Sequence, residues 1–330
     1  MLKINYLDKF DKNRYFKTIS DKYFHIAKHE LLQEVFCRVG VSHQIEQNGG
    51  ILPPYEKTTI TIQELFDYLK SHKIADFDTL FDGITLEDII IGDIDTLQKI
   101  KNTIGLKKEN KYIDFLFNYT NLQSKKIKPF FENNLHIATC YYCNIDYINT
   151  YNTRSGKKNK FTLDHYYDKG SYSYLALSLY NLIPSCYACN SKLKGVEEFT
   201  NLAPSSYKFN FNKKVKFKLL LSDNCKNLHI KSKDDIEIPL KENYSNEYEK
   251  YIEVFKLNER YQAHKDIVFE MMQNAELYPE SRLRELQELT GIPYQQIKKD
   301  IFNLIDDDVD LSKKPFSKLI KDISEELKLI

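Results

Sequence analysis

The spacing of apolar residues predicts helices in the first 130 positions. Segment 61–69 and, more loosely, segment 16–32 repeat their apolar residues at intervals of three and four, which is the helical period. An Asn-Gly-Gly at 48–50 and a Pro-Pro at 53–54 mark a loop between them. We therefore expect residues 1–130 to form a mainly helical region that contacts a partner protein or DNA.

The pattern changes to alternation between residues 207 and 240. Apolar residues there alternate with lysines, namely Phe209, Phe211, Val215, Phe217 and Leu219. This two-residue period, with turn signals at 223–224 and 234–235, predicts antiparallel strands.

From about residue 247 the pattern is helical again. One stripe repeats at steps of four and three, through Leu257, Tyr261, His264, Val268 and Met271. Because His264 lies on this apolar stripe, we expect it to be a histidine of the core.

Within segment 283–305, Gly291 would end one helix and Pro293 would lie in the first turn of the next. That pattern is typical of a DNA-reading helix-turn-helix, but ordinary helical hairpins have it too.

Length and composition indicate a globular protein of about two domains. Hydrophobic residues make up 42% and charged residues 29% of the 330 positions, which excludes wholesale disorder. No apolar run approaches the roughly eighteen residues of a membrane-spanning helix. Because residues 1–5 contain no apolar signal-peptide region, we expect a cytoplasmic protein without a membrane partner.

The net charge of +1 conceals three local blocks. Segment 73–95 has seven acidic residues and one lysine, and the surface it forms suits a partner protein better than DNA. Segments 101–128 and 205–233 are basic, with net charges of +5 and +7. Each basic block is typical either of a solvated face or of a nucleic-acid contact.

Four of the six cysteines form two Cys-x-x-Cys pairs, Cys140 with Cys143 and Cys186 with Cys189. Disulfides are rare in the cytosol, and four thiolates complete the tetrahedral site that Zn²⁺ prefers. We therefore predict structural zinc, with a redox pair as the alternative. The 42 residues between the pairs exceed the insert of a zinc ribbon. Cys37 and Cys225 lack partner spacing and are expected to be small buried residues.

Residues suited to metal-dependent hydrolysis lie between and after the cysteine pairs. A short apolar strand ends at Asp164 and His165, and Asn190 lies in a predicted helix over 188–194 that ends at Gly195. Carboxylate and amide oxygens suit a hard divalent cation, which neutralises charge developing on a phosphate. Histidine changes charge near neutral pH and suits the general base. Without the cysteines, Asp164 and His165 would indicate only a surface pair.

These residues resemble the HNH endonucleases, whose ββα-metal motif contains Asp-His, then Asn, then His or Asn, often inside two Cys-x-x-Cys pairs. The resemblance implies that His165 is the general base, that Asp164 and Asn190 hold the catalytic ion, and that Asn181 shapes the loop through backbone hydrogen bonds. Fifteen residues separate His165 from Asn181, and eight separate Asn181 from Asn190. The last motif position is Asn, a variant that keeps the metal role.

The resemblance extends from Cys140 to Gly195 and implies candidates for phosphate contacts at Lys192 and Lys194. Together with the helical and alternating patterns, it implies an α+β protein in three regions: a helical N-terminal region (1–130), a zinc-stabilised HNH core with added antiparallel strands (131–245), and a helical C-terminal region (246–330).

The implied activity is metal-dependent hydrolysis of phosphodiester bonds in DNA. Structural Zn²⁺ and catalytic Mg²⁺ or Mn²⁺ are the implied cofactors.

More loosely, the chain is similar to the HNH subunits of bacterial anti-phage systems, such as Septu-type and retron-associated nucleases, which act beside an ATPase partner. Two alternatives stay open. One is a stand-alone restriction or homing-type nuclease, and the other is a catalytically silent, zinc-dependent nucleic-acid-binding module. The sequence does not fix the target, the preference for DNA over RNA, or the oligomeric state.

Overall fold

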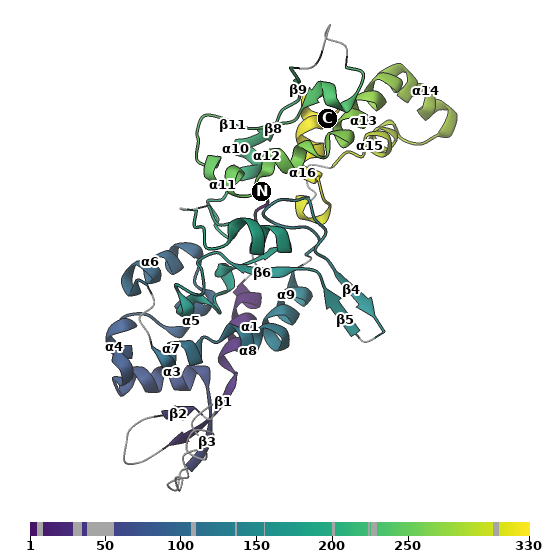
Figure 1. Ribbon diagram of the computed structural model, residues 1–330. Helices are drawn as coiled ribbons and strands as arrows, with labels where there is room; N and C mark the ends of the chain where they lie inside the picture. Colours follow the sequence, from purple (N-terminus) through teal and green to yellow (C-terminus); the bar gives the residue numbers. More distant parts are fainter. Residues whose placement is uncertain are drawn as a thin grey trace. The chain divides into compact units, whose positions relative to one another are not determined.

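Helices form the early and late parts of the chain, and short strands lie mostly between them (Figure 1). The computed structural model has an α+β fold and describes residues 1–4, 9–28, 35–37, 56–106, 110–135, 137–154, 156–199, 202–223, 225, 230–305 and 310–330. Contacts divide the chain into two units. The cysteine unit comprises Met1–Asn5, His136–Asp164 and Ile183–Ile330, and the histidine unit comprises Tyr6–Leu135 and His165–Leu182.

The two units interleave along the sequence, because the chain leaves the cysteine unit after Asp164 and returns to it at Ile183. The division into regions 1–130, 131–245 and 246–330 is a different partition and stays a prediction. No helix in the described part of the chain has the length and apolar character needed to cross a bilayer.

The histidine unit is mainly helical. Its helices are α1 (Lys9–Ser20), α3 (Ile62–Ser71), α4 (Phe77–Leu80), α5 (Leu86–Ile91), α6 (Ile94–Ile104), α7 (Lys111–Leu116), α8 (Tyr119–Leu122) and α9 (Lys128–Asn134). Short helical turns are η1 (Ile74–Asp76), η2 (Gln123–Ile127), η3 (Ser173–Leu175) and η4 (Leu179–Asn181). Aromatic rings build part of its core, and the Phe66 and Phe81 rings meet edge-to-face at 5.2 Å.

The helix expected at 61–69 is confirmed as α3, and its start has a local cause. The Thr61 side chain accepts a hydrogen bond from the backbone of Glu64, whose carboxylate accepts one from the backbone of Thr61. This capping box satisfies amide groups that a helix start otherwise leaves without partners. Asp88 and Asp93 have similar roles at α5 and α6, so part of the acidic block at 73–95 caps helices.

The expectation of a helix over 16–32 is wrong for residues 21–28, and residues 29–32 lie outside the described residues. The chain turns at Asp21 and then forms strand β1 (Tyr23–Lys28), which pairs antiparallel with β2 (Val35–Cys37) on one edge and β3 (Glu56–Thr61) on the other. Pairing on both edges satisfies the backbone of β1, and such tertiary context overrides weak local periodicity. The loop signals at 48–50 and 53–54 lie outside the described residues.

The cysteine unit combines short strands with the C-terminal helices. Its strands are β4 (Thr150–Thr153), β5 (Gly156–Asn159), β6 (Thr162–His165), β7 (Leu182–Ser185), β8 (Val215–Phe217), β9 (Leu220–Leu221), β10 (Ile236–Glu237) and β11 (Leu240–Glu242). The last residue of β6 and the first residue of β7 belong to the histidine unit. Its helices are η5 (Ala188–Lys194), α10 (Phe211–Lys214), η6 (Lys233–Asp235), α11 (Glu249–Val254), α12 (Leu257–Gln262), α13 (Lys265–Leu277), α14 (Glu280–Thr290), α15 (Tyr294–Phe302), η7 (Leu311–Lys313) and α16 (Ser317–Glu326).

Alternation over 207–240 yields antiparallel strands, as predicted. β8 pairs with β11, and β9 pairs with β10. The difference is at Phe211, which begins the short helix α10 and is fully buried. Its ring packs at 5.3 Å from that of Tyr251 on α11, so packing between aromatic rings decides the local conformation there.

The C-terminal helices end and begin where the sequence predicts. Gly291 ends α14 with a left-handed φ of 71° and Pro293 directly precedes α15. The predicted stripe is interrupted at His264, which lies between α12 and α13 and packs its ring 4.5 Å from that of Phe316. His264 is partly buried, and Cys225 is likewise only partly buried, so the expectation of a buried Cys225 is wrong. The side chain of Cys37 lies outside the described residues.

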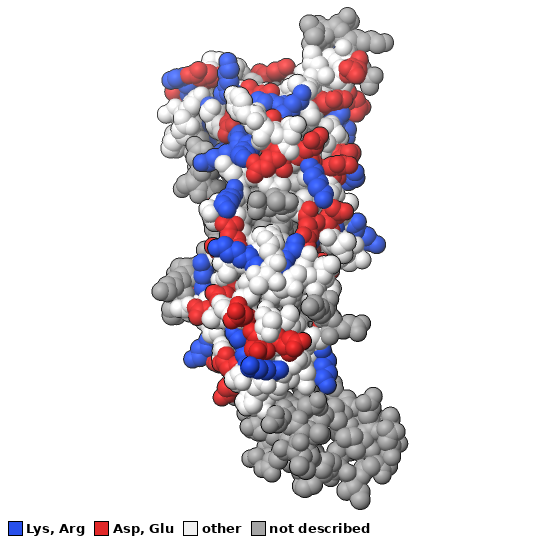
Figure 2. Space-filling view, turned by 90° about the vertical axis from the view of Figure 1, so that its left-hand side faces the viewer, with Lys and Arg blue, Asp and Glu red and all other residues white. Residues whose placement is uncertain are grey.

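Lysines of the basic block at 205–233 pair with acidic residues of the same unit. Lys214 pairs with Glu247, Lys216 with Asp322 and Glu325, and Lys218 with Glu326. Basic and acidic side chains also intermingle on the face shown in Figure 2. These pairs favour the interpretation of the block as a solvated, internally neutralised face.

A buried ion pair on α16 includes the residue that bonds this helix to strand β8. Lys318 and Asp322 are both fully buried, with Nζ 2.7 Å from Oδ2. Asp322 also accepts a hydrogen bond from the backbone of Phe217 in β8. Burial lowers the pKa of Lys318 to about 8, although Asp322 acts to raise it.

Replacing Asp322 with Asn should strongly destabilise the fold, because it leaves the Lys318 ammonium buried without a counter-charge. We expect the free energy of unfolding to fall by about 3–5 kcal/mol, as measured by urea denaturation at pH 7. Without Asp322 the folded-state pKa of Lys318 falls further below its unfolded value, so the unfolded chain binds more protons and the deficit should shrink toward pH 9.

Glu325→Gln is the matched control, because it removes a partly exposed partner of Lys216. Its cost should not exceed about 1 kcal/mol. Equal effects of the two substitutions would contradict the importance of the buried pair.

Candidate metal centre and catalytic residues

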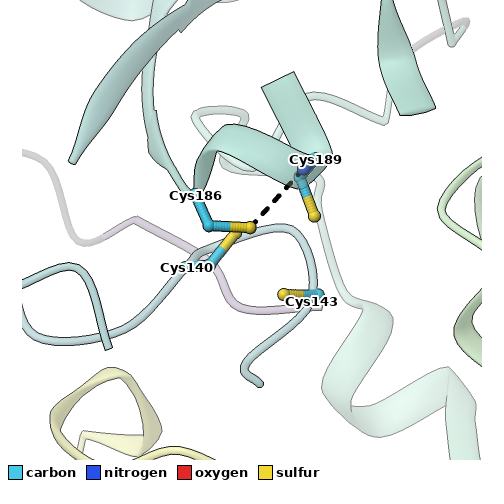
Figure 3. Close-up of side chains that lie close together, drawn as sticks. All are labelled: Cys140, Cys143, Cys186 and Cys189. Atoms are coloured by element: carbon cyan, nitrogen blue, oxygen red, sulfur yellow. Dashed lines mark hydrogen bonds between the residues drawn. The ribbon is translucent and has the colours of Figure 1, made fainter. Parts of the chain in front are cut away.

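Four buried cysteines converge in the cysteine unit. The sulfur atoms of Cys140, Cys143, Cys186 and Cys189 all lie within 4.8 Å of one another. Figure 3 shows Cys140 and Cys143 on one loop and Cys186 and Cys189 at the junction of β7 with η5, with the sulfurs directed toward a common centre. The cluster therefore joins two segments that are far apart in the sequence.

The donor set fits a zinc ion. In a tetrahedral site with Zn–S bonds of about 2.3 Å, neighbouring sulfurs lie about 3.8 Å apart, which is compatible with the observed limit of 4.8 Å. The four ligands are all sulfur and all buried, as in closed structural sites. A buried four-cysteine group that can hold a metal such as zinc is thus present, as the sequence predicted.

Hydrogen bonds to the sulfurs support this interpretation. The backbone amide of Ile145 donates to Sγ of Cys143 at 3.4 Å, and that of Cys189 donates to Sγ of Cys186 at 3.5 Å (dashed in Figure 3). Donors directed at the sulfurs stabilise thiolates and orient them as ligands.

Arg260 on α12 supplies positive charge beside the cluster. Its guanidinium donates to Sγ of Cys189 at 3.3 Å and to Sγ of Cys143 at 3.5 Å, and it also contacts Asp146. Burial alone would raise the pKa of Cys143, but hydrogen bonds from the other three cysteines and the charge of Arg260 lower it well below its usual value. Sequence reasoning missed Arg260, because a residue so distant from the motif has no spacing signal.

The buried Asp164 carboxylate contacts one side chain from the segment of each cysteine pair. The carboxylate is 3% exposed and lies in β6, which pairs with β7. Its Oδ2 accepts a hydrogen bond of 2.6 Å from Tyr142, which lies between Cys140 and Cys143. The same oxygen lies 3.2 Å from Nζ of Lys194 at the end of η5. The geometry of the four-cysteine cluster thus sets the surroundings of Asp164.

The buried position of Lys194 was not predicted. Its side chain is enclosed, so a contact with phosphate would require the pair with Asp164 to open, and that contact stays a prediction. Lys192 is exposed on the same helix and lies 5.9 Å from the ring centre of Tyr187. Asn190 is half-buried in η5, and its backbone amide donates to the carbonyl of Cys186.

His165 belongs to the histidine unit, although it directly follows Asp164. It is 9% exposed, and its ring lies edge-on to that of Tyr119 at 4.5 Å. Nε2 lies 3.1 Å from the carbonyl oxygen of Ala176. Because a carbonyl only accepts hydrogen bonds, Nε2 carries the proton of the neutral ring and Nδ1 is the basic nitrogen.

Asn181 holds together the loop that follows His165. Its buried side chain accepts a hydrogen bond from the amide of Tyr167 at 2.7 Å, and it donates to the carbonyls of Tyr167 and Leu175 at 3.1 and 3.0 Å. The Asn181 carbonyl also accepts from the amide of Tyr166. One side chain therefore connects the start and the end of segment 166–181.

No protein-family model, curated protein or solved structure matches this chain. The functional assignment consequently rests on the sequence motif and on the contacts within each unit.

Replacing Cys186 with Ser should remove one ligand and lower both the folded yield and the melting temperature. Coupled zinc binding and folding is worth about 10–16 kcal/mol in small zinc domains, so we expect zinc content to fall with stability. Cys225→Ser is the control, since Cys225 is partly exposed and lies outside the cluster. A well-folded Cys186→Ser protein with the stability of the control would contradict a structural metal.

Proposed function

We propose that this chain is a metal-dependent HNH endonuclease that hydrolyses phosphodiester bonds in DNA. The observation that carries the proposal is that two converging Cys-x-x-Cys pairs enclose, in sequence, a strand that ends in Asp164 and His165. A four-cysteine cluster alone suits many zinc proteins. The acid and imidazole at the strand end, followed by Asn181 and Asn190, are the features that favour a nuclease.

In the proposed reaction His165 accepts a proton from the attacking water at Nδ1. The hydrogen bond from Nε2 to Ala176 supports this role, because it holds the ring and fixes the tautomer. As the water oxygen forms its bond to phosphorus, the bond to the leaving oxygen breaks, and that oxygen takes a proton from solvent. A general base of this kind contributes about 10²–10⁴-fold to the rate.

Asp164 and Asn190 would hold the divalent cation, Mg²⁺ or Mn²⁺. Carboxylate and amide oxygens suit a hard cation, and Tyr142 and Lys194 already contact Oδ2 of the carboxylate. When bound, the cation supplies charge neutralisation at the phosphate and the leaving oxygen. The Lys194 ammonium competes with it for Asp164.

The zinc in this proposal is structural. It would hold Tyr142 and Lys194 in place around Asp164, because each lies within or beside a cysteine pair. With all four ligands being protein sulfurs, no position is open for substrate, unlike in catalytic zinc sites.

A second candidate function is a zinc-dependent nucleic-acid-binding module without turnover. The buried pair between Lys194 and Asp164 favours it, since the lysine already neutralises the carboxylate. A stand-alone restriction or homing-type nuclease is the alternative within the nuclease class. Action beside an ATPase partner in anti-phage defence stays a prediction from resemblance.

His165→Ala should abolish nicking of supercoiled plasmid in Mn²⁺ while zinc content and fold stay unchanged. We expect a rate loss of at least about 10²-fold, because the general base is gone. His72→Ala is the control, since His72 is exposed at the end of α3. Nicking by the His165→Ala protein at the rate of the control would contradict the proposed mechanism.

Lys194→Met should increase the affinity for Mn²⁺, measured by electron paramagnetic resonance titration without DNA. The substitution removes a positive charge that lies 3.2 Å from the carboxylate and competes with the cation, so we expect tighter binding by about tenfold or more. Lys192→Met is the control, because Lys192 lies two residues earlier on the same helix but is exposed. Unchanged or weaker Mn²⁺ binding by a folded Lys194→Met protein would contradict Asp164 as a ligand.

A further inference from the structure

Strands β4 and β5 form a two-stranded hairpin that pairs with no other strand of the described part of the chain. Thr150 pairs with Asn159, Tyr151 with Lys158, Asn152 with Lys157, and Thr153 with Gly156. The middle of the hairpin is exposed on both faces, because neighbouring residues point to opposite sides of a strand and Tyr151, Asn152, Lys157 and Lys158 are all exposed. Figure 1 shows the two strands as a separate ribbon.

The hairpin carries only positive charge. Segment 147–163 contains no Asp or Glu, and its four basic residues are Arg154, Lys157, Lys158 and Lys160. All four are exposed, and none forms an ion pair with a described residue. This distinguishes the hairpin from the basic block at 205–233, where Lys214, Lys216 and Lys218 are paired with carboxylates.

Two exposed aromatic residues accompany these charges. Tyr147 is 57% exposed just before β4, and Tyr151 is 45% exposed within it, directly opposite Lys158. Tyrosine presents a flat apolar ring with a polar end, which suits contact with sugars and bases as well as solvent.

A two-stranded hairpin without a covering layer is only marginally stable by itself, and its open edges invite pairing. Positive charge on such an edge opposes association with like copies and favours a polyanion. The major groove of B-DNA, about 12 Å wide, admits a two-stranded ribbon, whereas the deep and narrow major groove of A-form RNA does not.

We propose that the β4–β5 hairpin binds duplex DNA, with Arg154, Lys157, Lys158 and Lys160 contacting phosphates. This inference rests on the proposed nuclease function and gives that function its substrate-holding element. The hairpin directly precedes β6 in the chain. The proposed DNA-binding element is therefore joined to the strand that contains Asp164.

The test compares two quadruple variants of the full chain, in which either the four hairpin residues or Lys241, Lys256, Lys313 and Lys314 are replaced by Gln. The second set is exposed and lies in the same unit, so both variants lose four charges. Binding to a fluorescent 30-base-pair DNA duplex, to single-stranded DNA and to duplex RNA of the same length is measured by anisotropy over a range of salt, without divalent cation. Plasmid nicking is assayed separately.

Each lost phosphate contact should weaken binding about eightfold at 0.1 M salt and reduce the salt slope by about 0.9. We expect the hairpin variant to lose at least about 50-fold in affinity and the control to stay within about threefold of the parent. That loss supports the inference even if the parent does not nick DNA. Equal affinity of the two variants for the duplex, or a loss confined to single-stranded DNA or duplex RNA, would overturn it while leaving the nuclease proposal to the nicking assay.

Discussion

Four buried sulfur atoms bring together two segments that are separated by the 42 residues from 144 to 185. Each segment then directs one polar side chain at the same oxygen of Asp164, Tyr142 from the first cysteine pair and Lys194 from the helix of the second. Because a buried carboxylate without such partners would be strongly destabilising, the position of Asp164 depends on the cluster. In this structure the four-cysteine cluster and Asp164 belong to one connected network.

Cations lie beside both parts of the network. Arg260 donates hydrogen bonds to two of the sulfurs, and Lys194 pairs with Asp164. Such pairing lowers the cost of burying ionised groups, but Lys194 also lies where the proposed divalent ion has to bind. Lys194 thus neutralises Asp164 in this structure, and the proposed divalent ion would have to displace it.

The sequence predicted the parts of the site that have a fixed spacing. The two Cys-x-x-Cys pairs, the strand ending in His165, and the helix that stops at Gly195 all have local signals, and the structure contains each of them. The α+β class and the antiparallel strands after residue 207 also followed from periodicity. The assignment of these residues to an HNH nuclease stays a prediction, because it rests on resemblance.

Features that depend on distant packing were not predictable. Strand β1 has loose helical periodicity, and only its pairing with β2 and β3 makes it a strand. Its position after a cysteine pair suggests that Lys194 is a surface lysine, but its side chain is buried against Asp164. Arg260 lies far from the motif in sequence and reaches the sulfurs through the packing of α12. Such contacts join residues that no local pattern connects.

The most direct test of this account is X-ray absorption spectroscopy at the zinc edge, with metal analysis, on protein purified under reducing conditions without chelator. The account predicts one zinc ion per chain with four sulfur neighbours at about 2.3 Å. A folded protein without metal, or zinc bound mainly by nitrogen or oxygen, would contradict it, because the partners of Asp164 would then need another explanation for their position.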